Sequence, residues 1–230
     1  GEALGEACVD IALGTAFTPV MENGVISPQF VAIEKQQLRQ QLESERNDKR
    51  VYCLRQARRR FFGTSRAGIE AYGYLEEVDG LCAGDVTQAF FTMLREAQID
   101  VYLQGVDAHM AAEKLRAALG GVQRAPRPLA PACAMPHVRE QRFSEPVDAV
   151  QGKLCLMFTA GTPLAAAQLS AMRVAVALLG GTTTSRLFVN VREKQSLCYY
   201  CAASYTSLTG ALCVDSGVEH ANAAAARESI

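Results

Sequence analysis

Two cysteines stand three residues apart in Cys198-Tyr-Tyr-Cys201, the spacing that zinc sites and dithiol redox sites use. The surrounding residues are typical of a strand, on which side chains three apart point to opposite faces. A structural zinc needs four ligands, and the nearest further candidates are Cys213 and His220. We therefore expect two structural thiols, with metal or redox chemistry as the alternative.

The stretch Gly180-Gly-Thr-Thr-Thr-Ser-Arg186 has the glycines and hydroxyls of a phosphate-binding loop. It lacks the lysine of a P-loop and follows a predicted helix instead of a strand. The same residues suit a helix that ends at the glycines, followed by a Ser/Thr cap of the next helix. Between these two interpretations, the spacing favours the caps.

The histidines are His109, His137 and His220. His109 and Glu113 share one face of a predicted helix, but a zinc ion needs three or four ligands. Neither His-x-x-Glu-His nor His-Glu-x-x-His occurs in the 230 residues. We expect His109 and Glu113 to form a surface pair.

Between Glu34 and Arg60, nine basic residues stand against four acidic ones. A basic helix can bind nucleic acid, but no aromatic or glycine-rich recognition motif accompanies this one, so a solvated face is expected. The whole chain has a formal net charge of -1, and no apolar run approaches the roughly 20 residues that span a bilayer. We expect neither a nucleic-acid nor a membrane partner.

The 230 residues suffice for one large domain or two half-domains. Eight cysteines are scattered, mostly within apolar patterns, as is typical of buried reduced thiols in a cytoplasmic protein. The chain opens without an initiator methionine or a signal peptide and ends inside a helical pattern. We expect a piece of a longer protein.

Periodicity and turn residues predict the elements of the first half. Helices are expected over 2–17, 28–62 (starting at Ser27-Pro28), 85–97 (capped by Asp85) and 107–119, with a strand over 99–105.

Four of the eight prolines fall in residues 121–136, which predicts an extended linker. Beyond it, the expected elements are strands 137–143 and 154–158, helices 164–179 and 185–194, a hairpin of 197–205 and 211–218 through Gly210, and a helix from about 220. Both halves mix helices with strands, which predicts an α+β fold. The predicted division is 1–120, 121–136 and 137–230.

The stretch from Leu179 to Tyr199, LGGTTTSRLFVNVREKQSLCY, closely resembles the pitrilysin/insulinase pattern LGG-x-x-x-SRLF-x-x-VREK-x-x-L-x-Y. Residues 210–217 match the strand that follows this motif in the family. Further matches lie in order along the chain, at 17–19, 34–36, 47–49, 73, 78–85 and 99–105. The resemblance implies two halves of a pitrilysin/insulinase-type domain, each with helices packed on a mainly antiparallel sheet.

Active members of this family are inverzincins, which hold zinc through His-x-x-Glu-His and a downstream glutamate. That glutamate lies seven residues after an earlier one. Counting from Glu34 reaches Gln41, whose neutral amide is a poor zinc ligand, whereas a two-residue shift of the alignment reaches Glu43. The resemblance thus implies no catalytic residue and no cofactor in this chain, although active relatives use zinc.

In the family, an arginine and a tyrosine seven residues later contact substrate, and Arg192 and Tyr199 match that spacing. Arginine offers a fork of donors to a peptide carbonyl, and tyrosine adds one hydroxyl. The alternative is a structural Arg192 paired with Glu193 and a Tyr199 that faces the core.

Three hypotheses follow from the resemblance. The chain is a non-catalytic partner that binds peptide or unfolded polypeptide beside an active, homologous zinc peptidase, with strand addition to a sheet edge contributing to binding. Alternatively, it is a fragment of an active zinc peptidase whose motif lies upstream, or a structural protein that binds no peptide.

Overall fold

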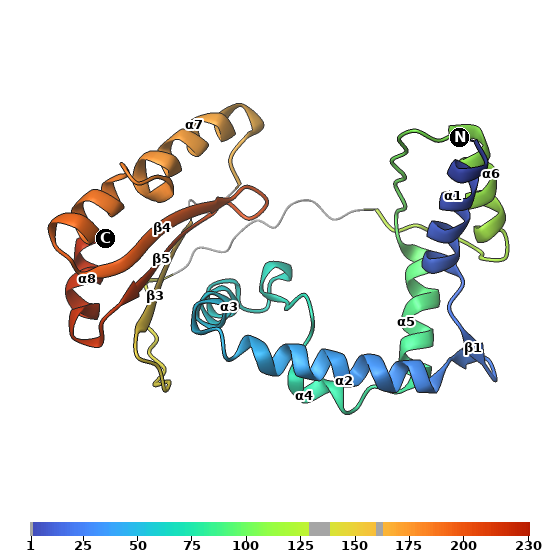
Figure 1. Ribbon diagram of the computed structural model, residues 1–230, viewed down its shortest axis with the longest axis horizontal. Coiled ribbons are helices and arrows are strands. Elements are labelled where there is room, and N and C mark those ends of the chain that lie inside the picture. The colour runs from blue at the N-terminus through green and yellow to red at the C-terminus, as the bar shows by residue number, and fades with distance from the viewer. Residues whose placement is uncertain (1, 129–138, 160–162) are drawn as a thin grey trace. The chain divides into compact units, whose positions relative to one another are not determined.

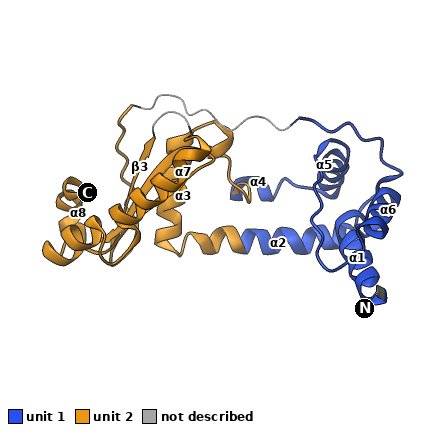
Figure 2. Ribbon diagram, turned by 90° about the horizontal axis from the view of Figure 1, so that it is seen from above, with its two compact units in different colours: residues 1–40, 75–130 blue, residues 41–74, 131–230 orange. Residues whose placement is uncertain are grey.

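The computed structural model describes residues 2–128, 139–159 and 163–230, and the chain divides into two compact units (Figure 2). Unit 1 contains residues 1–40 and 75–130, and unit 2 contains residues 41–74 and 131–230. The chain thus passes from unit 1 into unit 2 and back before it enters unit 2 again. The predicted division at 121–136 stays a prediction, because residues 129–136 lie outside the described part.

Unit 1 is mostly helical. Its elements are α1 (Glu2–Phe17), β1 (Met21–Glu22), β2 (Val25–Ile26), the first part of α2 (Pro28–Glu45), α4 (Leu75–Val78), α5 (Ala83–Glu96) and α6 (Ala108–Leu119). Strands β1 and β2 form a hairpin whose turn residues Asn23 and Gly24 have φ values of 50° and 82°. Asn-Gly favours this two-residue turn, so the chain reverses direction here.

The helix starts of unit 1 follow the expected chemistry only in part. Helix α2 begins at Pro28 as predicted, but the Ser27 hydroxyl donates to the Glu22 carboxylate and does not cap the helix. At α6, the Met110 N–H donates to the Asp107 carboxylate at 2.6 Å. At α5, Cys82 is the capping residue, and Asp85 sits one turn in, where it accepts from the Cys82 N–H at 2.8 Å. The prediction that Asp85 itself caps the helix is therefore wrong by three residues.

Two predicted elements of the first half are wrong. Residues 28–62 form two helices, because Asp48 starts a new one, α3 (Lys49–Phe62), by accepting from the N–H groups of Arg50 and Val51. Residues 99–105 are not a strand. Alternation alone makes no strand, since a strand needs a neighbour, and within the described residues no backbone pairs with this segment.

Unit 2 contains a three-stranded antiparallel sheet (Figure 1). Its strands are β3 (Gly152–Thr159), β4 (Cys198–Thr206) and β5 (Ala211–Val218), and β5 lies in the middle. The hairpin of β4 and β5 and the apolar strand at 154–158 were predicted, and both predictions are confirmed. The predicted strand at 137–143 is wrong for residues 139–143, which form no strand, while 137 and 138 lie outside the described residues.

One face of this sheet is covered by helices from the C-terminal part of the chain. They are α7 (Ala166–Val176), the π-helical segments η2 (Ala177–Gly181) and η3 (Phe188–Lys194), the short η4 (His220–Asn222) and α8 (Ala223–Ser229). Val214 and Val218 of β5 pack there with Leu187 and Val191 in the main apolar cluster. Gly180 lets helix and strand approach closely, because a Cβ at this position would lie 2.6 Å from the Ala203 backbone nitrogen.

The opposite face of the sheet is covered by α3 and the single turn η1 (Arg66–Gly68). Phe62 and Ala67 pack against Ala211 of β5 in a second apolar cluster. Nearby, the Arg50 Nε donates to the Asp215 carboxylate at 2.6 Å, and its guanidinium lies 4.6 Å from the centre of the Tyr200 ring. Unit 2 is therefore three layers, with β5 enclosed between two sets of helices, and the predicted α+β fold is confirmed.

Replacing Arg50 with glutamine is expected to destabilise unit 2. The Asp215 side chain is only 11% exposed, so removing the Arg50 guanidinium leaves a buried negative charge without a cationic partner. The expected loss in the free energy of unfolding is about 2 kcal/mol. Urea unfolding of Arg50→Gln measures this loss, and Arg46→Gln, which changes an exposed side chain, serves as the control. Equal stabilities of the two variants would show that the ion pair does not hold α3 to the sheet.

Candidate functional site

Arg192 lies on η3, held in place by the apolar residues on the other side of that helix. Leu187 and Val191 are buried at 3% and 1% exposure in the main cluster, whereas the Arg192 side chain is 42% exposed. Its guanidinium stacks 4.6 Å from the centre of the Phe188 ring, and its Nε lies 3.6 Å from Glu193 Oε1. The stacking limits the rotamers of Arg192 while leaving most of its donors toward solvent.

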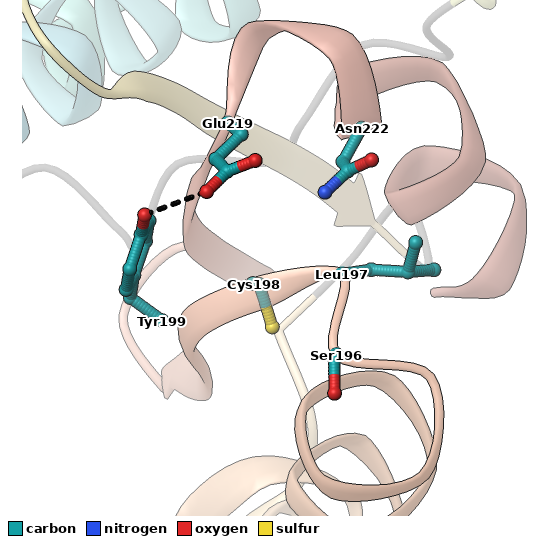
Figure 3. A pocket seen from close by; sticks show the side chains of 6 residues that line it. All are labelled: Ser196, Leu197, Cys198, Tyr199, Glu219 and Asn222. Carbon is teal, nitrogen blue, oxygen red and sulfur yellow. Dashed lines mark hydrogen bonds between the residues drawn. The ribbon is translucent and has the colours of Figure 1, made fainter.

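Tyr199 lies at the start of β4, beside a bulge between Cys198 and Tyr200. Its side chain is 49% exposed, and its hydroxyl donates to Glu219 Oε1 at 2.9 Å (Figure 3). Glu219 directly follows the last residue of β5, which is why the two side chains meet at the same end of the hairpin. The hydrogen bond and the negative charge of Glu219 raise the pKa of Tyr199, because both favour the neutral phenol.

A shallow recess opens beside this hydrogen bond (Figure 3). It is lined by Ser196, Leu197, Cys198, Tyr199, Glu219 and Asn222. Ser196 has a φ of 52°, and the N–H groups of Ser196 and Leu197 donate to the carbonyls of Arg192 and Val191, both at 3.1 Å. This left-handed cap ends η3 and fixes the turn that carries the chain from Arg192 to Tyr199.

The structure places Arg192 and Tyr199 on consecutive elements, each with its own acidic neighbour. The alternative in which Tyr199 faces the core is wrong, since half of its side chain is exposed. The alternative pairing of Arg192 with Glu193 is present, but an exposed pair at this separation contributes at most about 1 kcal/mol. Both residues are thus exposed to solvent, Arg192 on η3 and Tyr199 on β4.

Glu219 was not identified from the sequence. It carries no motif, and its importance comes only from its place opposite Tyr199. The predicted hairpin could have pointed to Glu219, because pairing of its strands through Gly210 places the residues just after β5 beside the first residues of β4. Counting the register along that hairpin would have found it.

Gln41 and Glu43, the two candidates for the downstream ligand position, lie near the end of α2. Both are exposed, while Leu42 between them is buried. Glu45, two residues further on, forms an ion pair with Arg55. Across residues 2–128, 139–159 and 163–230, no three His, Cys, Asp or Glu side chains gather in the arrangement of a metal site.

The Cys198 and Cys201 pair differs from expectation. Their side chains were predicted to point to opposite faces of the sheet, but both are buried in the same apolar cluster. The bulge between Cys198 and Tyr200 shifts the register by one residue and turns both thiols to one side. Burial raises the pKa of Cys201 to about 12, so this thiol stays protonated and unreactive.

The remaining motifs are used structurally. Ser185 caps the helix that follows the glycines, since its Oγ accepts from the Phe188 N–H at 3.4 Å, and this part of the cap interpretation is confirmed. The preceding helix runs on to Gly181 and is capped by Thr182, with Gly180 as a kink inside it, so the predicted end at the glycines is one residue too early. His109 and Glu113 lie 3.8 Å apart and are both well exposed, as expected of a surface pair. The arginines of α3 have partners within unit 2: Arg50 with Asp215, Arg55 with Glu70, Arg58 with the Ala67 carbonyl, Arg59 over the Tyr74 ring and Arg60 over the Phe143 ring.

A sequence profile of the family described as "Peptidase M16 inactive domain" matches residues 81–230, about two thirds of the chain. The chain belongs to this family. The pitrilysin/insulinase resemblance is thereby confirmed. The matched span contains η3, β4 and β5, and with them Arg192, Tyr199 and Glu219.

Relatives of this M16 chain are similar over about half of their own length. The "Probable inactive metalloprotease YmfF" of Bacillus subtilis (strain 168) is 28% identical over 207 residues, which cover 90% of this chain and 49% of that protein.

Solved structures share the fold. A conserved protein from Enterococcus faecalis V583 superposes with a TM-score of 0.83 at 24% identity, over 100% of this chain and 54% of that one. A peptidase M16 inactive domain from Pseudomonas fluorescens gives 0.63 at 16% identity, over 93% and 51%. None of the helices described for this chain is long and apolar enough to cross a bilayer.

Replacing Glu219 with glutamine is expected to lower the pKa of Tyr199. Glutamine keeps a hydrogen-bond acceptor but removes the negative charge that opposes ionisation of the phenol. NMR titration of protein labelled at tyrosine Cζ measures this shift, with Glu228→Gln on the exposed end of α8 as the control. An unchanged Tyr199 titration in Glu219→Gln would show that the hydrogen bond is not formed in solution.

Cys201 is expected to resist alkylation. At pH 9.0, the ordinary pKa of a thiol, a pKa of about 12 leaves about one Cys201 in a thousand ionised. Because the unfolded thiol loses its proton more readily, this group also makes the protein less stable as the pH rises from 9 toward 12. Iodoacetamide labelling followed by mass spectrometry should show Cys201 reacting at least about a hundredfold more slowly than exposed Cys8. Equal rates would contradict the buried position.

Proposed function

We propose that this chain is a non-catalytic, peptide-contacting member of the M16 family, which works beside an active, homologous zinc peptidase. The observation that carries the proposal is the presentation of Arg192 and Tyr199. Both side chains are substantially exposed, although their immediate neighbours Val191 and Cys198 are buried. Val191 and Cys198 supply the packing of the two elements, so Arg192 and Tyr199 are not needed in the core and can serve a ligand.

The chemistry of Arg192 suits an extended peptide. Its guanidinium is held against the Phe188 ring, so its direction is set before a ligand arrives, and less rotamer freedom is lost on binding. Peptide carbonyls are acceptors, and arginine offers several donors in a fixed plane. The exposed Tyr199 ring adds apolar contact area at one edge of the same surface.

The backbone around Arg192 supports a functional use. Residues 188–194 form a π-helical segment, a rare geometry that often occurs at functional sites. The wide turn ends at Ser196, whose left-handed conformation is unusual for a residue other than glycine or asparagine. Such features persist where the surrounding structure holds them, here through Val191 and Leu197 in the main cluster.

The partner in this proposal is a homologue that supplies zinc. The family name "inactive domain" and the relative named a probable inactive metalloprotease support a chain that does not itself cleave peptides. Among the 230 residues there is no His-x-x-Glu-His motif. The metal chemistry of the assembly would then belong to the other subunit, and this chain would contribute donors to the substrate.

Arg192→Ala is expected to weaken binding of a neutral, extended peptide about tenfold, the size of a lost hydrogen bond from a charged donor. Tyr199→Phe removes the phenol oxygen, which has given its hydrogen to Glu219 but keeps lone pairs that can accept from a peptide N–H, and about a threefold loss is expected. The measurement is fluorescence anisotropy with an N-acetylated, C-amidated peptide that contains no charged residue. Arg186→Ala, two residues before η3, and Tyr102→Phe in unit 1 change exposed side chains and serve as controls.

Two results would contradict the proposal. If Arg192→Ala and Tyr199→Phe bind the peptide as tightly as the unmodified chain does, these residues make no contact with substrate. That result would favour the alternative of a structural protein that binds no peptide. If the protein from its natural host carries stoichiometric zinc and cleaves peptides after any homologue is removed, it is an active peptidase. Loss of that zinc in Glu43→Gln would then place Glu43 at the ligand position that Gln41 occupies in the preferred alignment.

A further inference from the structure

The Tyr199 hydroxyl has one hydrogen to donate, and Glu219 accepts it at 2.9 Å. The phenol oxygen keeps its lone pairs, and the carboxylate keeps its second oxygen. The pair therefore presents only acceptors to an incoming ligand, together with one negative charge. A peptide carbonyl, itself an acceptor, has nothing to bind at this point.

The negative charge of Glu219 is not neutralised within the described part of the chain. Among the described residues, the Glu219 carboxylate accepts a hydrogen bond from the neutral Tyr199 hydroxyl. The adjacent His220 side chain contacts the Ala149 carbonyl instead, with its Nε2 at 3.2 Å. The nearest arginine of the site, Arg192, is engaged with Phe188 and Glu193. Glu219 is exposed, so a ligand can reach its carboxylate.

The recess beside the pair has the shape and chemistry to hold the end of a polar side chain. Figure 3 shows the Glu219 and Asn222 side chains on one side of it and Ser196 on the other, with Leu197 between. Figure 3 draws the Asn222 amide nitrogen toward the recess and the Ser196 hydroxyl away from it, so the acceptors there are the Glu219 carboxylate and the Tyr199 phenol oxygen. An ammonium or guanidinium group has several donors and a positive charge, which complements such a lining.

We propose that the Tyr199–Glu219 pair is a subsite for a positively charged donor of the bound peptide. This proposal rests on the proposed function and deepens it, since it names the class of peptide that the surface selects. Arg192 contacts the peptide backbone through its donors, while the pair accepts from a lysine or arginine side chain or from the N-terminal ammonium. Arg192 and the Tyr199–Glu219 pair thus carry opposite charges and bind different parts of one peptide.

The test compares four fluorescent peptides of one length and backbone. The first is N-acetylated with norleucine at the central position, the second N-acetylated with lysine there, the third N-acetylated with acetyl-lysine, and the fourth has a free N-terminus and norleucine. The unmodified chain is expected to bind the lysine peptide about fivefold more tightly than the norleucine peptide, as one exposed charge-assisted hydrogen bond gives. The acetyl-lysine peptide should bind like norleucine, and the fourth peptide shows whether a terminal ammonium substitutes for the side chain.

Glu219→Gln is the decisive variant. It keeps the size and the acceptor oxygen but removes the charge, so the ratio of lysine-peptide to norleucine-peptide affinity, measured within this variant, should fall to near unity. Glu228→Gln, an exposed carboxylate on α8, should keep the fivefold preference. An unchanged preference in Glu219→Gln, or no preference in the unmodified chain, would overturn the proposal.

Failure of this proposal is distinguishable from failure of the proposed function. If the norleucine peptide binds and Arg192→Ala weakens it, but lysine brings no gain, the peptide surface stands and the charged subsite does not. If the lysine peptide alone binds, Glu219→Gln abolishes that binding and Arg192→Ala has no effect, the subsite stands and the role of Arg192 is wrong.

Discussion

The burial of β5 on both faces is the constraint on which unit 2 depends. Val214 and Val218 point into the cluster made with η3 and α8, while Ala211 and Asp215 meet α3 on the other side. The Arg50–Asp215 ion pair satisfies a carboxylate that would otherwise be stranded at that second face. A helix from the first part of the chain, α3, thereby covers one face of a sheet whose strands all come from the last part.

The candidate site takes its geometry from the ends of these same elements. The packing of Val191 fixes η3 and so directs Arg192 outward, and the β4–β5 register brings Tyr199 to Glu219. The base of the site is therefore buried and its polar ends are exposed, an arrangement that suits contact with an extended peptide.

Local signals in the sequence predicted much of unit 2, and the errors have physical causes. The hairpin through Gly210 and the cap at Ser185 depend on neighbours in sequence, and these predictions were confirmed. The single helix over 28–62 was wrong because one capping aspartate, Asp48, outweighed a continuous helical pattern. The two thiols of β4 share one face because of a bulge, and Glu219 meets Tyr199 because β4 and β5 pair. Neither the bulge nor the contact between Tyr199 and Glu219 can be predicted from residue types alone. Arg192 and Tyr199 were found only because the motif around them is specific.

The most direct test of the central claim is to observe Tyr199 while peptide is added. In protein labelled with ¹³C at tyrosine Cζ, the Tyr199 resonance is assigned by its absence in Tyr199→Phe, and a neutral extended peptide is titrated in. The account predicts a saturable shift of Tyr199 that Arg192→Ala weakens, with Tyr102 of unit 1 unmoved. A peptide that binds and shifts other tyrosines while Tyr199 stays still would contradict the claim that this surface contacts substrate.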